Sequence, residues 1–438
     1  MKTQLLYGSD ALEIEIPENA TVYASSYPQP AGPASDLALE AIRSPLGAPP
    51  LKSALRQRRP GNVVIVVSDA TRPIPYAHFL NALIGEILGV GVTAREILIL
   101  VATGMHRASA PAERRRMFGG DICSDYRIID HKAEDDSELL ELDGRSWAGN
   151  RIRLNRHFAT AGFRIITGLV EPHFMAGFSG GRKAICPGLV SIETVRRFHG
   201  YEFLANPSAR NGQLHGNPCH QEALSIARLA GADFALNVAL NRDRQIVRAF
   251  AGELEASHEA ACEFVRMCAC PRAAFEHDIV LTSCGGHPLD ATFYQCVKGM
   301  ASCLPAVKNR GVIISAGGCS EGVGSPDYRE MMFEYSGRWR EFLQHIKTAS
   351  EVRKDQWEFQ MQARALEKVG PANLYFATDG LTGEEAQRLS VRGVSAEEGN
   401  VQKAVQTLLD SMLREKRSLA VIPEGPYCSP IKEERLPE

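Results

Sequence analysis

The stretch "NVVIVVSDATRP" (Asn62–Pro73) is followed closely by "HFLNALIGEILG" (His78–Gly89). The first is a run of β-branched residues that ends in turn-forming residues, which is typical of a strand buried on both faces. The second has apolar residues at helical spacing. A buried strand that leads into a helix indicates an α/β domain with a parallel sheet.

Five further runs of this kind begin at Glu96, Phe163, Asp278, Gly311 and Asn373. We therefore predict the α/β class, with two domains, each a mostly parallel sheet flanked by helices, and an active site in the cleft between them. Residues 1–270 form the first domain and 275–399 the second. The tail, residues 400–438, contains the strand-like run "SLAVIPEGPYC" and is expected to join the first domain.

Composition narrows the class of protein. The 438 residues carry a net charge of -3, and 44% are hydrophobic, which fits a soluble enzyme and gives no general attraction to nucleic acid or to a membrane surface. No apolar segment resembles a signal peptide or a membrane span, so we expect a cytoplasmic protein. The eleven cysteines are expected to be thiols, since they form no disulfide framework and "MCAC" lacks zinc-ligand spacing.

Polar side chains follow four of the predicted strands. In open α/β sheets, ligands bind beyond the carboxyl ends of the strands, so these side chains are expected to converge on one cleft. They are Asp69, Thr71 and Arg72 in "SDATRP", Thr103 and His106 in "ATGMHR", His173 and Lys183 in the third, and Tyr294, Gln295 and Lys298 in the fourth.

Each of these residues also has a structural interpretation. Asp69 could cap a following helix. A single histidine is more often a hydrogen-bonded structural residue than a catalyst, and this holds for His106, His173 and His199 taken one at a time. The histidines outside the strand ends keep the structural interpretation; they include His78, His131, His258 and His345.

The glycine-rich turn "GFSGGRKA" (residues 177–184) differs from a nucleotide-triphosphate loop, because arginine interrupts the Gly-Lys pair and alanine follows Lys183. Consecutive backbone N–H groups ahead of a helix could still bind an anion such as a phosphate. Lys183 would then be either its counter-charge or a covalent nucleophile.

In their order along the chain, "SDATRP", "ATGMHR", "EPHFMAGFSGGRKAICPG", "FHG", "GNPCHQE" and "YQCVKG" resemble the nickel-dependent lactate racemases and related 2-hydroxyacid racemases and epimerases. The resemblance covers most of residues 60–300 and continues more weakly to Trp357 and beyond. It implies a nickel-pincer nucleotide, a pyridinium mononucleotide that binds nickel through sulfur, carbon and sulfur, at the junction of two α/β domains. It also implies cofactor-biosynthesis enzymes that load the protein.

By this resemblance, Lys183 would be tethered to the cofactor through a thioamide and His199 would be the protein's nickel ligand. His106 and His173 would be the two acid-base residues. The remaining positions would contact cofactor or substrate: Asp69, Thr71, Arg72 and Tyr294 the cofactor, and Arg72, Gln295, Lys298 and Trp357 the substrate. The chain departs from the family's usual pattern at Ala184 and Cys186.

The implied reaction is chemically coherent. Removing the C2 proton of a 2-hydroxy carboxylate would create a dianion, and moving a hydride to an electrophilic cofactor avoids it. The hydroxyl must lose its proton as the hydride leaves, and two mirror-image substrates need two bases. Gln295 and Lys298, three residues apart on a helix that Asp290 is expected to cap, share a face.

Two other classes stay open. A zinc metallohydrolase would use His106, His173 and His199 as ligands. A binding protein would close on an organic acid without chemistry. The sequence does not name which small 2-hydroxy acid is the substrate, nor the oligomeric state.

Overall fold

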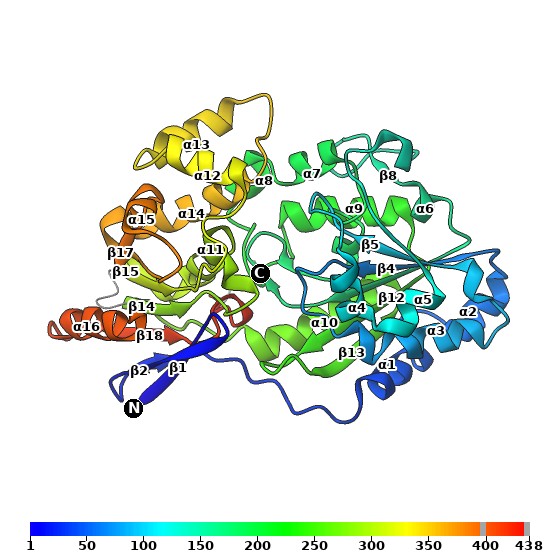
Figure 1. Ribbon diagram of the computed structural model, residues 1–438, viewed down its shortest axis with the longest axis horizontal. Helices are drawn as coiled ribbons and strands as arrows, with labels where there is room; N and C mark the ends of the chain where they lie inside the picture. Colours follow the sequence, from blue (N-terminus) through cyan, green and yellow to red (C-terminus); the bar gives the residue numbers. More distant parts are fainter. Residues whose placement is uncertain (395–399, 433–438) are drawn as a thin grey trace, which may run out of the picture.

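The computed structural model describes residues 1–394 and 400–432. Two lobes lie side by side, and each is built around one large sheet with helices packed against it (Figure 1). The α/β class and the two-lobed architecture predicted from the sequence are confirmed. The six predicted strands are all present, as β4, β5, β9, β14, β15 and β16.

The first sheet has the strand order β13-β12-β9-β4-β5-β6. Neighbouring strands are parallel except β12 and β13, which pair antiparallel. The strands are β4 (Val63–Ser68), β5 (Ile97–Ala102), β6 (Arg127–Asp130), β9 (Phe163–Leu169), β12 (Phe234–Leu240) and β13 (Ile246–Gly252). The helices of this lobe are α1 (Ala34–Arg43), α2 (Leu51–Arg58), α3 (Leu80–Leu88), α4 (Pro111–Phe118), α5 (Gly120–Asp125), α6 (Arg156–Ala159), α7 (Ile192–Phe198), α8 (Tyr201–Ala205), α9 (Pro218–Ala230) and α10 (Leu254–Ala269).

The second sheet has the order β17-β16-β15-β14-β18-β3, with every neighbouring pair parallel. Its strands are β3 (Thr21–Val22), β14 (His277–Ser283), β15 (Val307–Ala316), β16 (Leu374–Ala377), β17 (Arg392–Val394) and β18 (Leu419–Ile422). Its helices are α11 (Phe293–Ser302), α12 (Pro326–Glu334), α13 (Trp339–Thr348), α14 (Gln356–Val369), α15 (Gly383–Arg388) and α16 (Val401–Leu413). Three hairpins complete the fold: β1 (Lys2–Tyr7) with β2 (Asp10–Glu15), β7 (Leu139–Glu141) with β8 (Arg153–Asn155), and β10 (Pro172–His173) with β11 (Gly177–Phe178).

Strand β4 shows why the opening sequence forms a buried strand. Val63, Ile65 and Val67 belong to one apolar core, and Val64 and Val66 belong to another. Side chains alternate between the two faces of a strand, so each core covers one face of the sheet. Helices α1 to α3 contribute to the first of these cores, and α7 and α9 to the second.

Strand β18 of the tail and the N-terminal strands lie in the second lobe, which corrects the predicted domain limits, whereas Ser429 and Ile431 further along the tail hydrogen-bond to the backbone at the end of the first domain. Strand β18 was expected to join the first domain, but it pairs with β14 on one side and with β3 on the other. All four residues of β18 are buried, and such a strand needs a neighbour on each side, which the open edge of β14 supplies. Residues 1–22 therefore complete the second lobe, although we expected them in the first (Figure 1).

The order of the strands decides where a ligand can bind. From β4 the chain moves to β5 and β6 on one side, then returns to β9 on the other side of β4. Such a reversal leaves a crevice at the carboxyl ends of the two central strands. Residues 69–72 follow β4 and residues 170–173 follow β9, so both segments border this crevice.

Two of the histidines outside the strand ends, His131 and His258, are structural residues, whereas His78 and His345 are exposed. The ring of His131 is 3% exposed; its Nε2 lies 2.9 Å from the carbonyl oxygen of Val190, and its Nδ1 lies 3.2 Å from the side-chain amide of Asn155. His258 is also buried and lies 2.7 Å from the guanidinium of Arg182. Burial lowers the pKa of His131 to about 4.

Burial of His131 makes the fold sensitive to acid. In the unfolded chain His131 binds a proton below about pH 6.5, whereas in the native chain it does so only near pH 4. The free energy of unfolding is therefore unaffected by this residue above pH 6.5 and decreases as the pH falls from 6.5 to 4. One such group contributes a slope of about 1.4 kcal/mol per pH unit. We expect His131→Gln to remove roughly that slope from urea unfolding measured between pH 7 and 5. The same exchange at the exposed His345 is the control, and an unchanged slope in His131→Gln would contradict the argument.

All eleven cysteines are free thiols, and ten of them are buried. None of the helices formed by residues 1–394 and 400–432 is long and apolar enough to cross a membrane.

Candidate active site

A cavity of about 340 Å³ lies between the two lobes, at the carboxyl ends of β4, β5 and β9. Its volume falls within the range of small-molecule sites. Every site residue predicted from the sequence lines this one cavity. They are Asp69, Thr71, Arg72, His106, His173, Lys183 and His199 from the first lobe, and Tyr294, Gln295, Lys298 and Trp357 from the second.

Asp69 orients His106. One carboxylate oxygen lies 2.6 Å from Nδ1 of His106, and the other accepts hydrogen bonds from the backbone and the hydroxyl of Thr71. Burial by itself would raise the pKa of Asp69, but the hydrogen bond and charge of His106 hold it below its ordinary value. A carboxylate at Nδ1 fixes the proton there and leaves the lone pair on Nε2, as a base requires. Asp69 is thus a partner of His106 and caps no helix.

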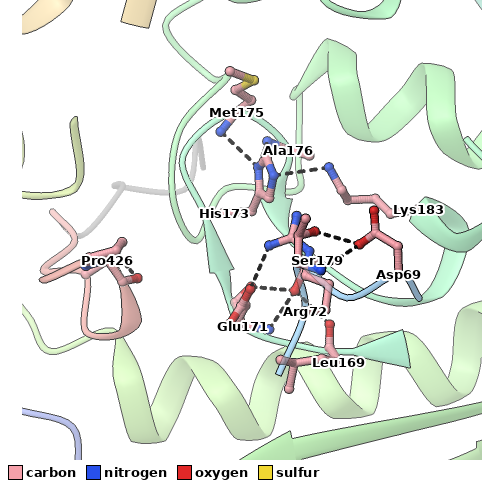
Figure 2. A network of polar contacts seen from close by, with 12 residues as sticks. Asp69, Arg72, Leu169, Glu171, His173, Met175, Ala176, Ser179, Lys183 and Pro426 are labelled. Carbon is pink, nitrogen blue, oxygen red and sulfur yellow. Dashed lines mark hydrogen bonds and ion pairs between the residues drawn. The ribbon is translucent and has the colours of Figure 1, made fainter. Parts of the chain in front are cut away.

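The ring of His173 is held by the backbone that follows it (Figure 2). The N–H groups of Met175 and Ala176 both lie 3.2 Å from Nδ1 and donate to it. In the neutral ring the proton is therefore on Nε2, which lies 3.2 Å from Nζ of Lys183. Burial, followed by the nearby charges of Lys183 and Arg72, keeps the pKa of His173 well below its ordinary value, so the ring is neutral.

The side-chain ammonium group of Lys183 loses its proton more readily than that of an ordinary lysine. Burial, followed by the positive charges of Arg72 and Arg182, lowers the pKa of Lys183 to about 7. Near neutral pH, about half of these side chains have a lone pair on nitrogen. The amine can then accept the Nε2–H of His173, and it is a nucleophile.

Buried hydrogen bonds hold the glycine-rich turn that presents Lys183. Arg182 is 1% exposed, and its guanidinium lies 2.7 Å both from the carbonyl oxygen of Ala176, to which it donates, and from Nε2 of His258. The N–H of Gly181 donates to the side chain of Asn237. A Cβ on Gly180, whose φ is +73°, would come within 2.6 Å of Val170, so glycine lets the turn lie against the end of β9.

This geometry weakens the interpretation of the turn as a phosphate cradle. The N–H of Ser179 donates to the carbonyl oxygen of Glu171, and that of Gly181 is already paired. The helix that follows is a single 3-10 turn, Gly181–Ala184. The glycines serve close packing of the backbone, and the role of the turn is to place Lys183.

His199 lies directly after α7, at the boundary between the lobes. Its Nδ1 donates to the carbonyl oxygen of Val195 over 2.8 Å, which leaves the lone pair on Nε2. Burial lowers the pKa of His199 to about 3, so the ring is neutral. Imidazole ligands of metals are commonly held by such a bond from the other ring nitrogen to a carbonyl. The ring of His199 also packs on that of Trp357 in the second lobe, with centroids 4.6 Å apart.

The second lobe supplies the opposite wall through α11 and α14. Trp357 donates its indole N–H to the hydroxyl of Tyr294 over 2.8 Å. Nζ of Lys298 lies 5.8 Å from the centre of the Phe174 ring, which belongs to the first lobe. Burial, and then the charge of Arg72, lowers the pKa of Lys298.

The predicted cap of α11 was wrong. Thr292 is the N-cap residue, and its hydroxyl accepts the N–H of Gln295. Asp290 instead accepts hydrogen bonds from the N–H groups of Gly8 and Gly318, both at 2.8 Å. A buried carboxylate that ties the N-terminal hairpin to the second sheet could not be identified from local spacing.

Two carboxylates near the predicted residues were not singled out from the sequence. The carboxylate of Glu171 forms an ion pair with Arg72 at 3.1 Å, and the hydroxyl of Ser179 donates to the backbone carbonyl oxygen of Glu171. Glu358 follows Trp357 on α14 and lines the cavity. Glu171 could have been found, because it opens the motif that contains His173; Glu358 gives no signal of its own in the sequence.

Nowhere in the described part of the chain do three or more His, Cys, Asp or Glu side chains come together in a way that could hold a metal ion. His106, His173 and His199 line one cavity but do not form the three-ligand centre that the zinc hydrolase alternative requires.

Cys186, where the sequence departs from the usual pattern, is fully buried in the core beneath the turn. Burial raises the pKa of its thiol, so this side chain packs as a small apolar group.

The chain is similar in sequence to known lactate racemases. The family model for the lactate racemase N-terminal domain matches residues 7–212, and that for the lactate racemase C-terminal domain matches residues 273–427. The lactate racemase of Thermoanaerobacterium thermosaccharolyticum is 38% identical over 333 residues, 76% of this chain and 77% of that one. The lactate racemase of Lactiplantibacillus plantarum is 36% identical over 330 residues, 75% of this chain and 76% of that one.

Solved structures extend the similarity over the whole fold. The lactate racemase apoprotein from T. thermosaccharolyticum superimposes with a TM-score of 0.89 at 32% identity, covering 99% of this chain and all of the other. A protein from Thermotoga maritima shares the fold at 17% identity, with a TM-score of 0.65 over 89% of this chain and all of the other.

Proposed function

The chain belongs to the lactate racemase family and is an isomerase, and from this premise we propose that it inverts C2 of a 2-hydroxy acid by proton-coupled hydride transfer. In this proposal the hydride acceptor is a nickel-pincer nucleotide bound covalently to Lys183, and the reaction passes through a 2-keto acid.

One observation carries the proposal: a buried lysine amine with a pKa of about 7 lies in the same cavity as an imidazole whose Nε2 lone pair is left for a ligand. The first is what acylation by a thiocarboxyl group needs, and the second suits a single bond to nickel whose other donors are soft. Lys183 and His199 are therefore the residues that fit the cofactor.

When bound, the cofactor would accept the hydride from C2 and return it to the other face of the carbon. His106, held by Asp69 with its Nε2 lone pair available, would take the hydroxyl proton of one enantiomer. His173, whose Nε2 faces Lys183 in the same cavity, would be the second acid-base group: in its imidazolium form it would give a proton to the oxygen after the 2-keto acid has turned, and so return to the neutral ring. In the opposite direction the two histidines exchange these roles.

Arg72 from the first lobe and Lys298 from the second both line the cavity and supply positive charge there. They would hold the substrate carboxylate while the 2-keto acid turns, and the amide of Gln295 would add a hydrogen bond. Thr71 fixes the Asp69 carboxylate, and the Trp357–Tyr294 pair forms the wall next to His199.

Loading would require enzymes that make the cofactor, and these are the partners we propose. The eleven free thiols are in keeping with a reducing cytoplasm as the place where loading occurs.

The test is to produce the protein together with the cofactor-producing enzymes. Intact mass under denaturing conditions and nickel content would be measured, and single enantiomers of several 2-hydroxy acids would be followed by optical rotation. We expect a covalent mass increment, about one nickel per chain, and loss of rotation toward zero. A protein with the mass of the bare chain and no racemisation of any acid would overturn the proposal.

A further inference from the structure

Glu358 is a buried carboxyl group in the cavity wall that the proposed reaction does not use. The residue is 1% exposed and lines the cavity beside Gln295, Lys298 and Trp357. Its Oε1 atom has no hydrogen-bond partner in the described part of the chain. A buried carboxyl oxygen without a partner is costly, and binding sites are where proteins keep such groups.

The neighbours of Glu358 leave it unsatisfied. The indole N–H of Trp357 and the hydroxyl of Tyr294 are paired with each other. The side-chain oxygen of Gln295 is also buried and without a partner among the described residues, as is the hydroxyl of Tyr328 behind the wall. Both Glu358 and Gln295 line the cavity, and each has one buried side-chain oxygen without a hydrogen-bond donor among the described residues.

Burial and the neighbouring charges determine the protonation state of the Glu358 carboxyl group. Burial raises the pKa of Glu358; the positive charges of Lys298 and Arg72 oppose this, and the negative charge of Asp355 adds to it. The group can therefore be either protonated or ionised near neutral pH. A ligand hydroxyl can pair with both forms, because it donates to a carboxylate and accepts from a carboxylic acid. A methyl group pairs with neither.

We propose that Glu358 is a specificity-determining residue that hydrogen-bonds a hydroxyl group on C3 of the substrate, so that the protein prefers 2,3-dihydroxy acids to 2-hydroxy acids with an alkyl side chain. This inference rests on the proposed function for the reaction at C2. Glu358 lines the part of the cavity formed by the second lobe, next to Lys298 and Gln295, which would hold the substrate carboxylate, and the proposal places the C3 substituent at the Glu358 carboxyl group. Shape alone cannot discriminate between isosteric groups, whereas an unpaired buried carboxyl can.

The experiment compares 2,3-dihydroxypropanoate with 2-hydroxybutanoate, two acids of nearly equal size that differ by a hydroxyl in place of a methyl. The kcat/KM of each single enantiomer would be measured with the loaded protein, together with the Kd of each acid for the unloaded protein by calorimetry. The variants are Glu358→Gln, which keeps hydrogen bonding, and Glu358→Leu, which removes it. Glu367→Gln, an exposed position on the same helix, is the matched control.

We expect the unmodified protein and the Glu367→Gln control to favour the dihydroxy acid by about 10- to 100-fold in kcat/KM. Glu358→Gln should keep that ratio within about 3-fold, and Glu358→Leu should bring it to about 1 or below, with the Kd ratio moving the same way. If Glu358 only offsets the charge of Lys298, both variants would lower activity on the two acids in parallel and leave the ratio unchanged, which would overturn the inference. If the unmodified loaded protein racemises no acid, the proposed function is wrong. If it racemises both acids with equal kcat/KM, the proposed function stands and only the inference about Glu358 is wrong.

Discussion

Exchanging His106 or His173 for asparagine is expected to lower kcat/KM by about 10² to 10⁴-fold in both directions of racemisation. Each turnover takes a proton at one histidine and gives one at the other, so neither direction can proceed well with only one. The structure supports this division of work, because Asp69 holds the Nδ1 side of His106 while two backbone N–H groups hold that of His173.

The measurement is the initial rate from each pure enantiomer, with nickel content and intact mass determined on the same samples. His106→Asn should keep the covalent mass increment, since the ring of His106 is hydrogen-bonded to Asp69 and not to Lys183 among the described contacts. His345→Asn, on the exposed surface of α13, should keep full activity. A variant of either histidine that keeps kcat/KM within about 3-fold of the unmodified protein would contradict the two-histidine assignment.

The second large effect is expected at Lys183. Lys183→Ala and Lys183→Arg should both eliminate the covalent mass increment and reduce racemisation to the background rate, since neither side chain offers a neutral amine. Arginine keeps the positive charge, so its failure would separate the need for a nucleophile from a need for charge. Lys308→Arg, at an exposed lysine of the second lobe, is the control.

The same residue predicts how attachment depends on pH. The pKa of Lys183 is lowered to about 7, so the reactive neutral form is complete above about pH 8 and falls about tenfold for each unit below 7. Attachment followed by intact mass should show this midpoint. A midpoint near that of an ordinary lysine, or a mass increment that survives in Lys183→Ala, would exclude the tether at this position.

Much of the site could be predicted from the sequence because parallel sheets put chemistry at strand ends. Asp69, His106 and His173 follow three neighbouring strands, and their convergence needs only the correct assignment of β4, β5 and β9. The types of these residues and their positions directly after the strands were therefore enough to predict that their side chains line one cavity. The proton positions on the two histidines were not predictable, since they depend on the partners that each ring nitrogen meets in the fold.

Local sequence patterns could not predict contacts between residues that are far apart in the chain. Strand β18 has the same buried character as a strand of either sheet, and only the open edge of β14 decides its place. Asp290 satisfies the spacing of a helix cap, yet it binds backbone N–H groups from the N-terminal hairpin. Glu358 reads as an ordinary acid in the first turn of a helix, and its burial follows from the packing of α14 against α11.

The pairing of β3 with β18 has a consequence for how the protein is made. The two strands are separated by about 400 residues, and β3 has no other neighbouring strand in its sheet. At roughly 5 to 20 residues per second, the ribosome delivers β18 some 20 to 80 s after β3. During that interval the first lobe, which is contiguous in the chain, can fold on its own, while the N-terminal strand waits beside it with an open edge. A nascent chain of this protein is therefore expected to depend on a chaperone at its N-terminal segment more than at any part of the lobe that carries Lys183.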